Sequence, residues 1–253
     1  MIPGNVFKLA FCVVFFLVYL IYYTRCKRGE PLDIRPIAGL DAIDDAVGRC
    51  TEMGRPVHYT FGRGEYNSAI MSSFEVLNYT ATKCAETGTG IIVSTARPEV
   101  HAITEELVSS AYKMAGAGQE FKQDNIRFFS DLVSAYTAGI YGIFTRERPG
   151  ANIMLGHIYG ESMMLGEVGH KIGAIQIGGS SQIAQVPFLV ATCDYTLIGD
   201  ELFAAGAYVT REPSKMATIA AQDFGKIFVI GATLLGTILS TFGNTVIADI
   251  LKF

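Results

Sequence analysis

The sequence has little charge, few histidines and no closely spaced cysteines. Charged residues make up 17% of the 253 residues and the formal net charge is −4, so no extended basic surface for nucleic acid is expected. No two of the four histidines stand four residues apart, and the five cysteines form no C-x-x-C pair. These absences argue against a zinc site and favour a reducing compartment. We therefore expect no metal, no cofactor and no nucleic-acid partner.

Familiar signatures of nucleotide and hydrolase sites are missing as well. There is no G-K-[ST], which excludes a P-loop. Residues 61–67 read FGRGEYN, but Asn67 stands where a dinucleotide fingerprint has its third glycine, and no acid ends the next strand. GGSSQ at residues 178–182 lacks the closing glycine of a G-x-S-x-G elbow. A triad without its motif, built from Ser180 or Ser181 with His157 and Asp200, stays open because triads are defined by geometry.

Two long apolar segments stand at the ends of the chain. Residues 6–23 contain one charged side chain, and residues 227–248 contain none, as is typical of helices that cross a bilayer core of about 30 Å. A signal peptide would carry its positive charges before the first segment rather than after it. The basic residues that flank the segments place the middle of the chain in the cytoplasm: Arg25, Lys27, Arg28, Arg211, Lys215 and Lys226. We expect membrane helices at 5–24 and 225–249, around a cytoplasmic domain at 29–222.

The middle of the chain alternates short apolar runs with helical periodicity. Helices are expected at 40–53, around Ile70 to Cys84, around Val100 to Met114, and over two short stretches at 182–191 and 201–208. Apolar runs that are covered by helices on both faces form parallel strands. The pattern predicts an α/β fold with a Rossmann-like, mainly parallel sheet of five or six strands. The expected strands are 56–61, 90–94, 125–129, 152–155, 173–177 and 195–198.

Ligands of such sheets bind beyond the carboxyl ends of the strands, where this chain carries small and charged residues. A turn over Gly178, Gly179, Ser180 and Ser181 before a helix is a candidate anion cradle, because glycines let a ligand approach the backbone. Arg63 and Arg97 are candidate clamps for a phosphate or carboxylate, with Asp200 after the last strand. Ordinary strand-to-helix turns need the same residue types, so both interpretations stay open.

The C-terminal apolar segment carries two adjacent rows of small or hydroxylated residues. Such a face permits close helix packing in lipid, where no hydrophobic force drives helices together. It predicts a partner, which is either the first apolar segment or a second copy of the chain. The residues expected to pack are Ala232, Gly236, Thr237, Ser240, Thr241 and Asn244.

Three phrases of the sequence resemble an uncharacterised family of bacterial and archaeal membrane proteins that carry a domain of unknown function. They are GRPVHYTFG at 54–62, RERPGANIMLGHIYGES at 146–162 and VATCDYTLIGDELFAAGAYVTREP at 190–213. The resemblance implies the same order of span, α/β domain and span, and it brings no activity or catalytic residues.

These observations favour a membrane-anchored, non-catalytic α/β protein that forms an oligomeric scaffold and binds a small anionic ligand at the strand ends. Its expected partners are the lipid bilayer and further copies of itself. Two alternatives remain: an enzyme acting on a phosphorylated or membrane-proximal small molecule, and an anchor subunit for an unknown protein partner.

Overall fold

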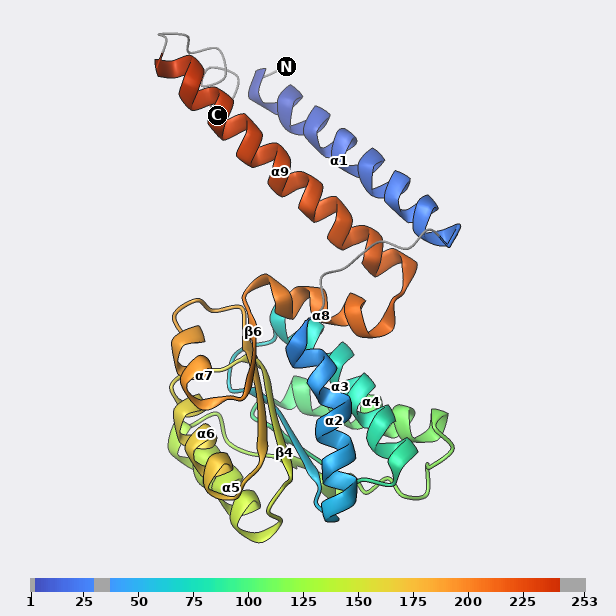
Figure 1. Cartoon of the computed structure of the whole chain (residues 1–253), viewed down its shortest axis with the longest axis vertical. Coiled ribbons are helices and arrows are strands. Elements are labelled where there is room, and N and C mark those ends of the chain that lie inside the picture. The colour runs from blue at the N-terminus through green and yellow to red at the C-terminus, as the bar shows by residue number, and fades with distance from the viewer. Residues whose placement is uncertain (1–2, 30–36, 242–253) are drawn as a thin grey trace. The chain divides into compact units, whose positions relative to one another are not determined.

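The computed structural model describes residues 3–29 and 37–241, and the chain divides into two compact units (Figure 1). One, the helical unit, comprises Met1–Ile34 and Arg211–Phe253, and the other, the α/β unit, comprises Arg35–Thr210. The helical unit contains α1 (Pro3–Lys27) and α9 (Pro213–Thr241).

The α/β unit confirms the predicted fold as a sheet of six strands that are all parallel. Its strands lie in the order β3-β2-β1-β4-β5-β6, so the direction in which strands are added reverses between β1 and β4. The strands are β1 (Val57–Gly62), β2 (Ile91–Thr95), β3 (Ile126–Phe128), β4 (Ala151–His157), β5 (Ile175–Ser180) and β6 (Tyr195–Ile198). In open α/β sheets this reversal opens the crevice that receives ligands.

Helices cover both faces of the sheet, as the apolar runs predict (Figure 1). They are α2 (Ala38–Met53), α3 (Ser68–Thr87), α4 (Pro98–Met114), α5 (Val133–Arg146), α6 (Glu161–Lys171), α7 (Val186–Thr192) and α8 (Asp200–Thr210). The short helix expected at 182–191 begins instead at Val186, and a 3₁₀ turn, η1 (Gln123–Asn125), precedes β3.

The two faces of the sheet differ in chemistry. On the apolar face, Tyr59, Phe61 and Ile153 pack against α2, α3, α4 and α8. The opposite face packs against α5, α6 and α7. It contains a row of buried polar side chains, Ser94, His58, Asn152 and Gln176, that are hydrogen-bonded to one another across the strands. We call this row the ladder and this side of the sheet the ladder face. This division follows from the alternation of side chains along each strand.

The sequence suggested a turn over Gly178 to Ser181, but the stretch Gly178 to Ser180 is the end of strand β5. Gly178 pairs with Met154 and Gly179 with Leu155 in the sheet. A Cβ atom on Gly178 would lie 2.6 Å from the Cys193 sulfur, and one on Gly179 would lie 2.7 Å from a methyl of Leu155. The lack of a side chain at these two glycines therefore lets neighbouring side chains pack directly against the backbone of β5.

In the helical unit, α1 packs along α9. The rings of Phe11 and Phe228 lie 5.7 Å apart, and a Cβ on Gly225 would lie 3.1 Å from the Phe15 ring. Ala232 and Gly236 are half-buried in α9. These contacts with the first apolar segment involve Phe228 and Gly225, which are not among the residues expected to pack, so the partner of the small-residue face stays a prediction.

The hydroxylated row of α9 is turned outward. Thr237 and Thr241 are exposed, and their hydroxyls donate to the carbonyls four residues earlier, at 2.8 Å in both cases. Ser240 is exposed as well, and Asn244 lies outside the described residues. Because the threonine hydroxyls already have partners within the helix, they need no second helix to satisfy them.

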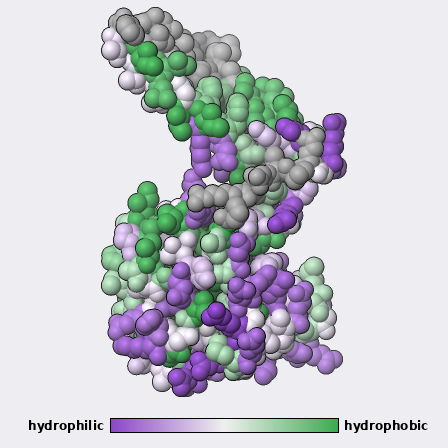
Figure 2. Space-filling model, viewed as in Figure 1, coloured by the Kyte–Doolittle hydropathy of each residue, from purple (hydrophilic) through white to green (hydrophobic). Residues whose placement is uncertain are grey.

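One helical segment of the described chain, Pro213–Ile238, is long and apolar enough to cross a membrane. Figure 2 shows apolar side chains gathered along it, including Ile227, Val229, Ile230, Leu234, Leu235 and Ile238. The helix begins at Pro213, earlier than predicted, because a polar first part with ion pairs such as Lys226 to Asp223 continues the helical turn. The predicted first span forms helix α1, and among the residues described Pro213–Ile238 is the one segment that qualifies as a span.

Candidate ligand site at the strand reversal

The loops after β1 and β4 meet where the strand order reverses. Gly62 has a φ of +80°, and a Cβ there would lie 2.4 Å from the carbonyl oxygen of His157. The N–H of Gly64 donates to that same carbonyl over 3.2 Å, and the His157 ring packs against the bare Cα of Gly64. The two glycines of the incomplete fingerprint are therefore required for this close contact between loops.

Asn67, which replaces the third glycine, joins the loop to the next helix. Its side-chain oxygen accepts from the N–H of Ile70 at 3.1 Å and caps α3. This orientation turns its NH₂ group toward Nδ1 of His157, at 2.7 Å. In the neutral His157 ring the proton consequently lies on Nε2, which is 3.4 Å from the side-chain nitrogen of Gln182. Because both of these nitrogens then carry hydrogen, this contact is not a hydrogen bond.

Arg63 and Arg97 converge on Asp131, in the loop after β3. The Nη1 of Arg63 donates to the Asp131 carbonyl over 2.6 Å, and Nη1 of Arg97 lies 3.5 Å from the Asp131 carboxylate. The two arginines follow the neighbouring strands β1 and β2, so the parallel sheet brings them to one edge. The structure thus brings together two of the residues that the sequence singled out.

Glu161 forms an ion pair with Arg63. Its Oε1 lies 3.2 Å from Nε of Arg63, and its side chain is only 1% exposed. The Arg63 guanidinium also lies over the Tyr159 ring, 5.6 Å from its centroid. Glu161 stands in the first turn of α6, where the helix dipole favours a carboxylate.

Buried polar atoms of this cluster have unmet hydrogen-bonding capacity. Neither carboxylate oxygen of Glu161 accepts a hydrogen bond within the described chain, and the same holds for the buried hydroxyl of Ser162. The Nε of Arg97 also lacks a hydrogen-bond partner there. Buried polar groups are rarely left in this state, so the cluster fits a site that acquires partners from a ligand or water.

The other candidate residues lie elsewhere along the carboxyl edge. Ser180 is buried and accepts from the N–H of Gln182 at 3.2 Å, and Ser181 follows it at the end of β5. Asp200 begins α8 after the edge strand β6. Nδ1 of His157 accepts from the Asn67 amide, and its Nε2 faces the side chain of Gln182 rather than Ser180, Ser181 or Asp200.

Sequence reasoning placed the two arginines but not the groups that complete the cluster. Asp131 and Tyr159 stand in loops whose course the strand pattern does not fix. Glu161 belongs to no motif in the sequence that would single it out. Its position could have been inferred from a single signal, a glutamate in the first turn of a helix that follows a central strand.

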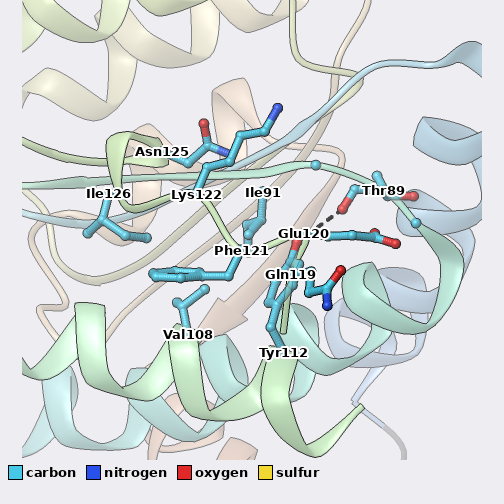
Figure 3. Close-up of a pocket in the computed structure, with 12 residues that line it drawn as sticks. Thr89, Ile91, Val108, Tyr112, Gln119, Glu120, Phe121, Lys122, Asn125 and Ile126 are labelled. Carbon is cyan, nitrogen blue, oxygen red and sulfur yellow. Dashed lines mark hydrogen bonds between the residues drawn. The ribbon is translucent and has the colours of Figure 1, made fainter. Parts of the chain in front are cut away.

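Three hollows of the described α/β unit lie away from this cluster. One of about 470 Å³ lies near the amino ends of β2 and β3 (Figure 3), and one of about 350 Å³ lies near the start of β5 and β6. A third, of about 370 Å³, lies between α5 and α6. The residues that the structure describes hold no group of three or more His, Cys, Asp or Glu side chains suited to a metal ion.

Comparison with known proteins identifies one family. The model of a family described as "Domain of unknown function (DUF6754)" matches residues 3–251, nearly the whole chain. No curated protein and no solved structure matches the chain.

Proposed function

The chain belongs to the DUF6754 family, and we propose that it is a membrane-attached, non-catalytic Rossmann-like protein that binds a small oxyanion at the strand reversal. The oxyanion is a phosphate or carboxylate group of a small molecule. Arg63 and Arg97 bind it, and further copies of the chain assemble through the helical unit into a platform. The fold and the family give no activity, so the proposal rests on the geometry of this cluster.

The convergence of two arginines on one acidic loop carries the proposal. Asp131 offers Arg63 a carbonyl oxygen and Arg97 a carboxylate oxygen. These are the contacts that a bound phosphate or carboxylate would make with two guanidinium groups. Asp131 is 53% exposed in its side chain, so it can move away when a ligand oxyanion replaces it.

Arg63 is held in place before any ligand arrives. Glu161 forms an ion pair with its guanidinium at 3.2 Å, although not with hydrogen-bond geometry, Tyr159 covers one face of the guanidinium, and the side chain is 16% exposed. An arginine held in this way loses little conformational entropy on binding. Arg97 is 31% exposed in its side chain and is the more exposed half of the clamp.

Membrane attachment and assembly are supported by the helical unit. α9 contains the segment that is long and apolar enough to span a bilayer, and the basic residues Lys215 and Lys226 stand in its first half. These features favour a second span as predicted and a cytoplasmic α/β unit. The exposed part of the small-residue face, at Ser240 and Thr241, is the surface proposed for contact between copies.

Calorimetric titration of the full chain in mild detergent tests the ligand site. Inorganic phosphate, a sugar phosphate and a nucleoside monophosphate are the probes. We expect R63M and R97M each to weaken binding about tenfold or more. D131N should strengthen it, because the internal competitor loses its charge. K171M, which removes an exposed lysine at the end of α6, is the matched control.

Two results would overturn the ligand proposal: no heat from any probe at millimolar concentration, or equal affinities for the wild type and R63M. Chemical turnover of a bound probe would contradict the non-catalytic scaffold and support the alternative that the protein is an enzyme. Assembly is tested separately by the mass of the detergent complex. A monomer at all working concentrations would exclude the platform, whereas an oligomer that S240L dissociates would support it.

A further inference from the structure

The hollow near the amino ends of β2 and β3 is the strongest unassigned feature of the α/β unit. Its volume of about 470 Å³ falls in the range of small-molecule sites, which is roughly 300 to 1,000 Å³. It lies at the edge of the sheet opposite the arginine cluster. A ligand here is therefore independent of the oxyanion proposed above.

The hollow has an apolar wall built from three elements. Val108 and Tyr112 come from α4, Ile91 and Ile126 from the first residues of β2 and β3, and Phe121 from the loop between α4 and β3. The rings of Tyr112 and Phe121 lie 6.1 Å apart. Figure 3 shows Phe121 between Ile91 and Val108. Such a wall suits an aliphatic or aromatic group of a ligand.

Four polar side chains of the hollow come from that same loop and have no partner elsewhere in the described chain. The side chains of Gln119, Glu120, Lys122 and Asn125 all line it, and none has a hydrogen-bond or ion-pair partner in the described part of the chain. Charged and amide side chains that face a hollow without partners can turn to a ligand at no cost in existing bonds.

The two charges of the rim are separated. In Figure 3, Lys122 stands beside Asn125 on one side of Phe121, while Glu120 and Gln119 stand on the other side, near Tyr112. Burial first, and with it the nearby Glu120 carboxylate, raises the pKa of the Tyr112 hydroxyl, which donates to the Thr89 carbonyl at 3.2 Å. The acidic side therefore keeps a neutral hydroxyl beside its carboxylate.

The loop that carries these groups is held by backbone hydrogen bonds. The N–H of Ala117 donates to the Tyr112 carbonyl at 2.9 Å, that of Glu120 to Ala117 at 2.9 Å, and that of Asn125 to Lys122 at 3.0 Å. The loop thus presents a fixed rim, which lowers the entropic cost of binding.

We propose that this hollow binds a small zwitterion with an apolar body, the chemistry of a free apolar α-amino acid. Lys122 and Asn125 receive its carboxylate, and Glu120 and Gln119 receive its ammonium. Phe121, which is partly exposed, covers its side chain, while Val108 and the strand residues lie buried behind it. Opposite charges on two sides of an apolar wall match this class, whereas a simple anion or amine would leave one charge of the rim unused.

Ligand-observed NMR titration of the full chain in detergent tests the site with L-phenylalanine as the probe. Two relatives of the probe each lack one charge: phenylalaninamide lacks the carboxylate and N-acetylphenylalanine lacks the ammonium. We expect each to bind about tenfold more weakly than phenylalanine. E120Q and K122M, both on the exposed loop, should each weaken phenylalanine by a similar factor.

A matching of charges distinguishes recognition from a merely structural effect. K122M should leave the affinity for phenylalaninamide unchanged, and E120Q that for N-acetylphenylalanine, because the group lost from the protein already lacks its partner on the ligand. E106Q and K113M, exposed changes on α4 outside the hollow, are the controls. No saturation transfer from any of the three probes would overturn the proposal, and so would equal losses for all probes in K122M.

Discussion

The two faces of the sheet bury similar strands by opposite means. On the apolar face, Tyr59, Phe61, Ile153 and their neighbours meet the helices with hydrocarbon. On the ladder face, polar side chains from four adjacent strands bond to one another across the sheet. One face is held by area and shape, in which small changes are tolerated gradually. The other is held by directed bonds, each of which leaves a buried partner unsatisfied when it is lost.

The ladder has a single arrangement of protons because it ends on backbone carbonyls. The NH₂ of Gln176 donates to the carbonyls of Gly166 and Thr192, so its side-chain oxygen must accept from Asn152, at 3.0 Å. The Asn152 oxygen then accepts from Nδ1–H of His58, at 2.8 Å, and Nε2 of His58 accepts from the Ser94 hydroxyl, at 2.9 Å. His58 is accordingly neutral, as expected of a structural histidine.

The largest contrast between the faces is expected at neighbouring positions of β4. N152A removes the central amide of the ladder and leaves Nδ1–H of His58 and the Gln176 oxygen buried without partners, which should cost about 3 to 5 kcal/mol of unfolding free energy. I153V shortens the next residue on the apolar face and should cost about 1 kcal/mol. Urea unfolding of the full chain in detergent, followed by near-UV circular dichroism, measures both.

A difference of less than about 1 kcal/mol between N152A and I153V would show that the ladder contributes no more than packing does. N152D is the further check, since it keeps the volume and the acceptor while removing the donor to Gln176. N152D should also lose more unfolding free energy than I153V does.

How much of this was predictable depends on which interactions set each part. The strands and the parallel sheet follow from local apolar runs, and the carboxyl edge follows from the sheet, so the convergence of Arg63 and Arg97 was within reach. The ladder was not, because His58, Asn152 and Gln176 are far apart in the sequence and align only through the strand register. The arginine cluster is completed by Asp131 and Glu161, whose positions depend on loop and helix starts that no period encodes.

Glycines account for the error at the end of β5. Gly178 and Gly179 resembled a turn because glycine is common in turns, yet here they let side chains approach a strand. In α6, a Cβ at Gly166 would lie 2.5 Å from Cβ of Thr192, and one at Gly169 would lie 2.7 Å from the Gln176 oxygen. A glycine chosen for close packing and one chosen for backbone angle look the same in a single sequence.

The second contrast is the pH dependence of the unfolding free energy, which should arise on the ladder face from His58. Burial lowers the pKa of His58 to about 4, against a hydrogen bond with Asn152 that raises it. The unfolded chain, with a histidine pKa near 6.5, therefore binds more protons between these values. The stability that His58 contributes is complete above about pH 6.5 and is lost as the pH falls toward 4, by about 3 kcal/mol in total.

Urea unfolding of the wild type and of H58L at pH 7.5, 6.0, 5.0 and 4.5 isolates this contribution, since the carboxylates titrate equally in both chains. The gap in unfolding free energy between the two should narrow steadily as the pH falls. A gap that stays constant across this range would mean that His58 keeps the same protonation in the folded and unfolded chains, which would contradict the ladder.

The smallest contrast is expected at the adjacent glycines of β5, which face opposite sides. G179A pushes a methyl against Leu155 and against Leu197, 2.9 Å away, on strands that are fixed by the sheet, and should cost about 2 kcal/mol. G178A meets Cys193 and Leu189, in and after the short helix α7, which can shift outward, so about 1 kcal/mol is expected. The same unfolding assay applies. G179A crowds the apolar face, whereas G178A crowds the ladder face. If G178A lost more unfolding free energy than G179A, the packing on the ladder face would be the stiffer of the two. That result would show that the hydrogen bonds of this face hold α7 as firmly as the sheet holds its strands.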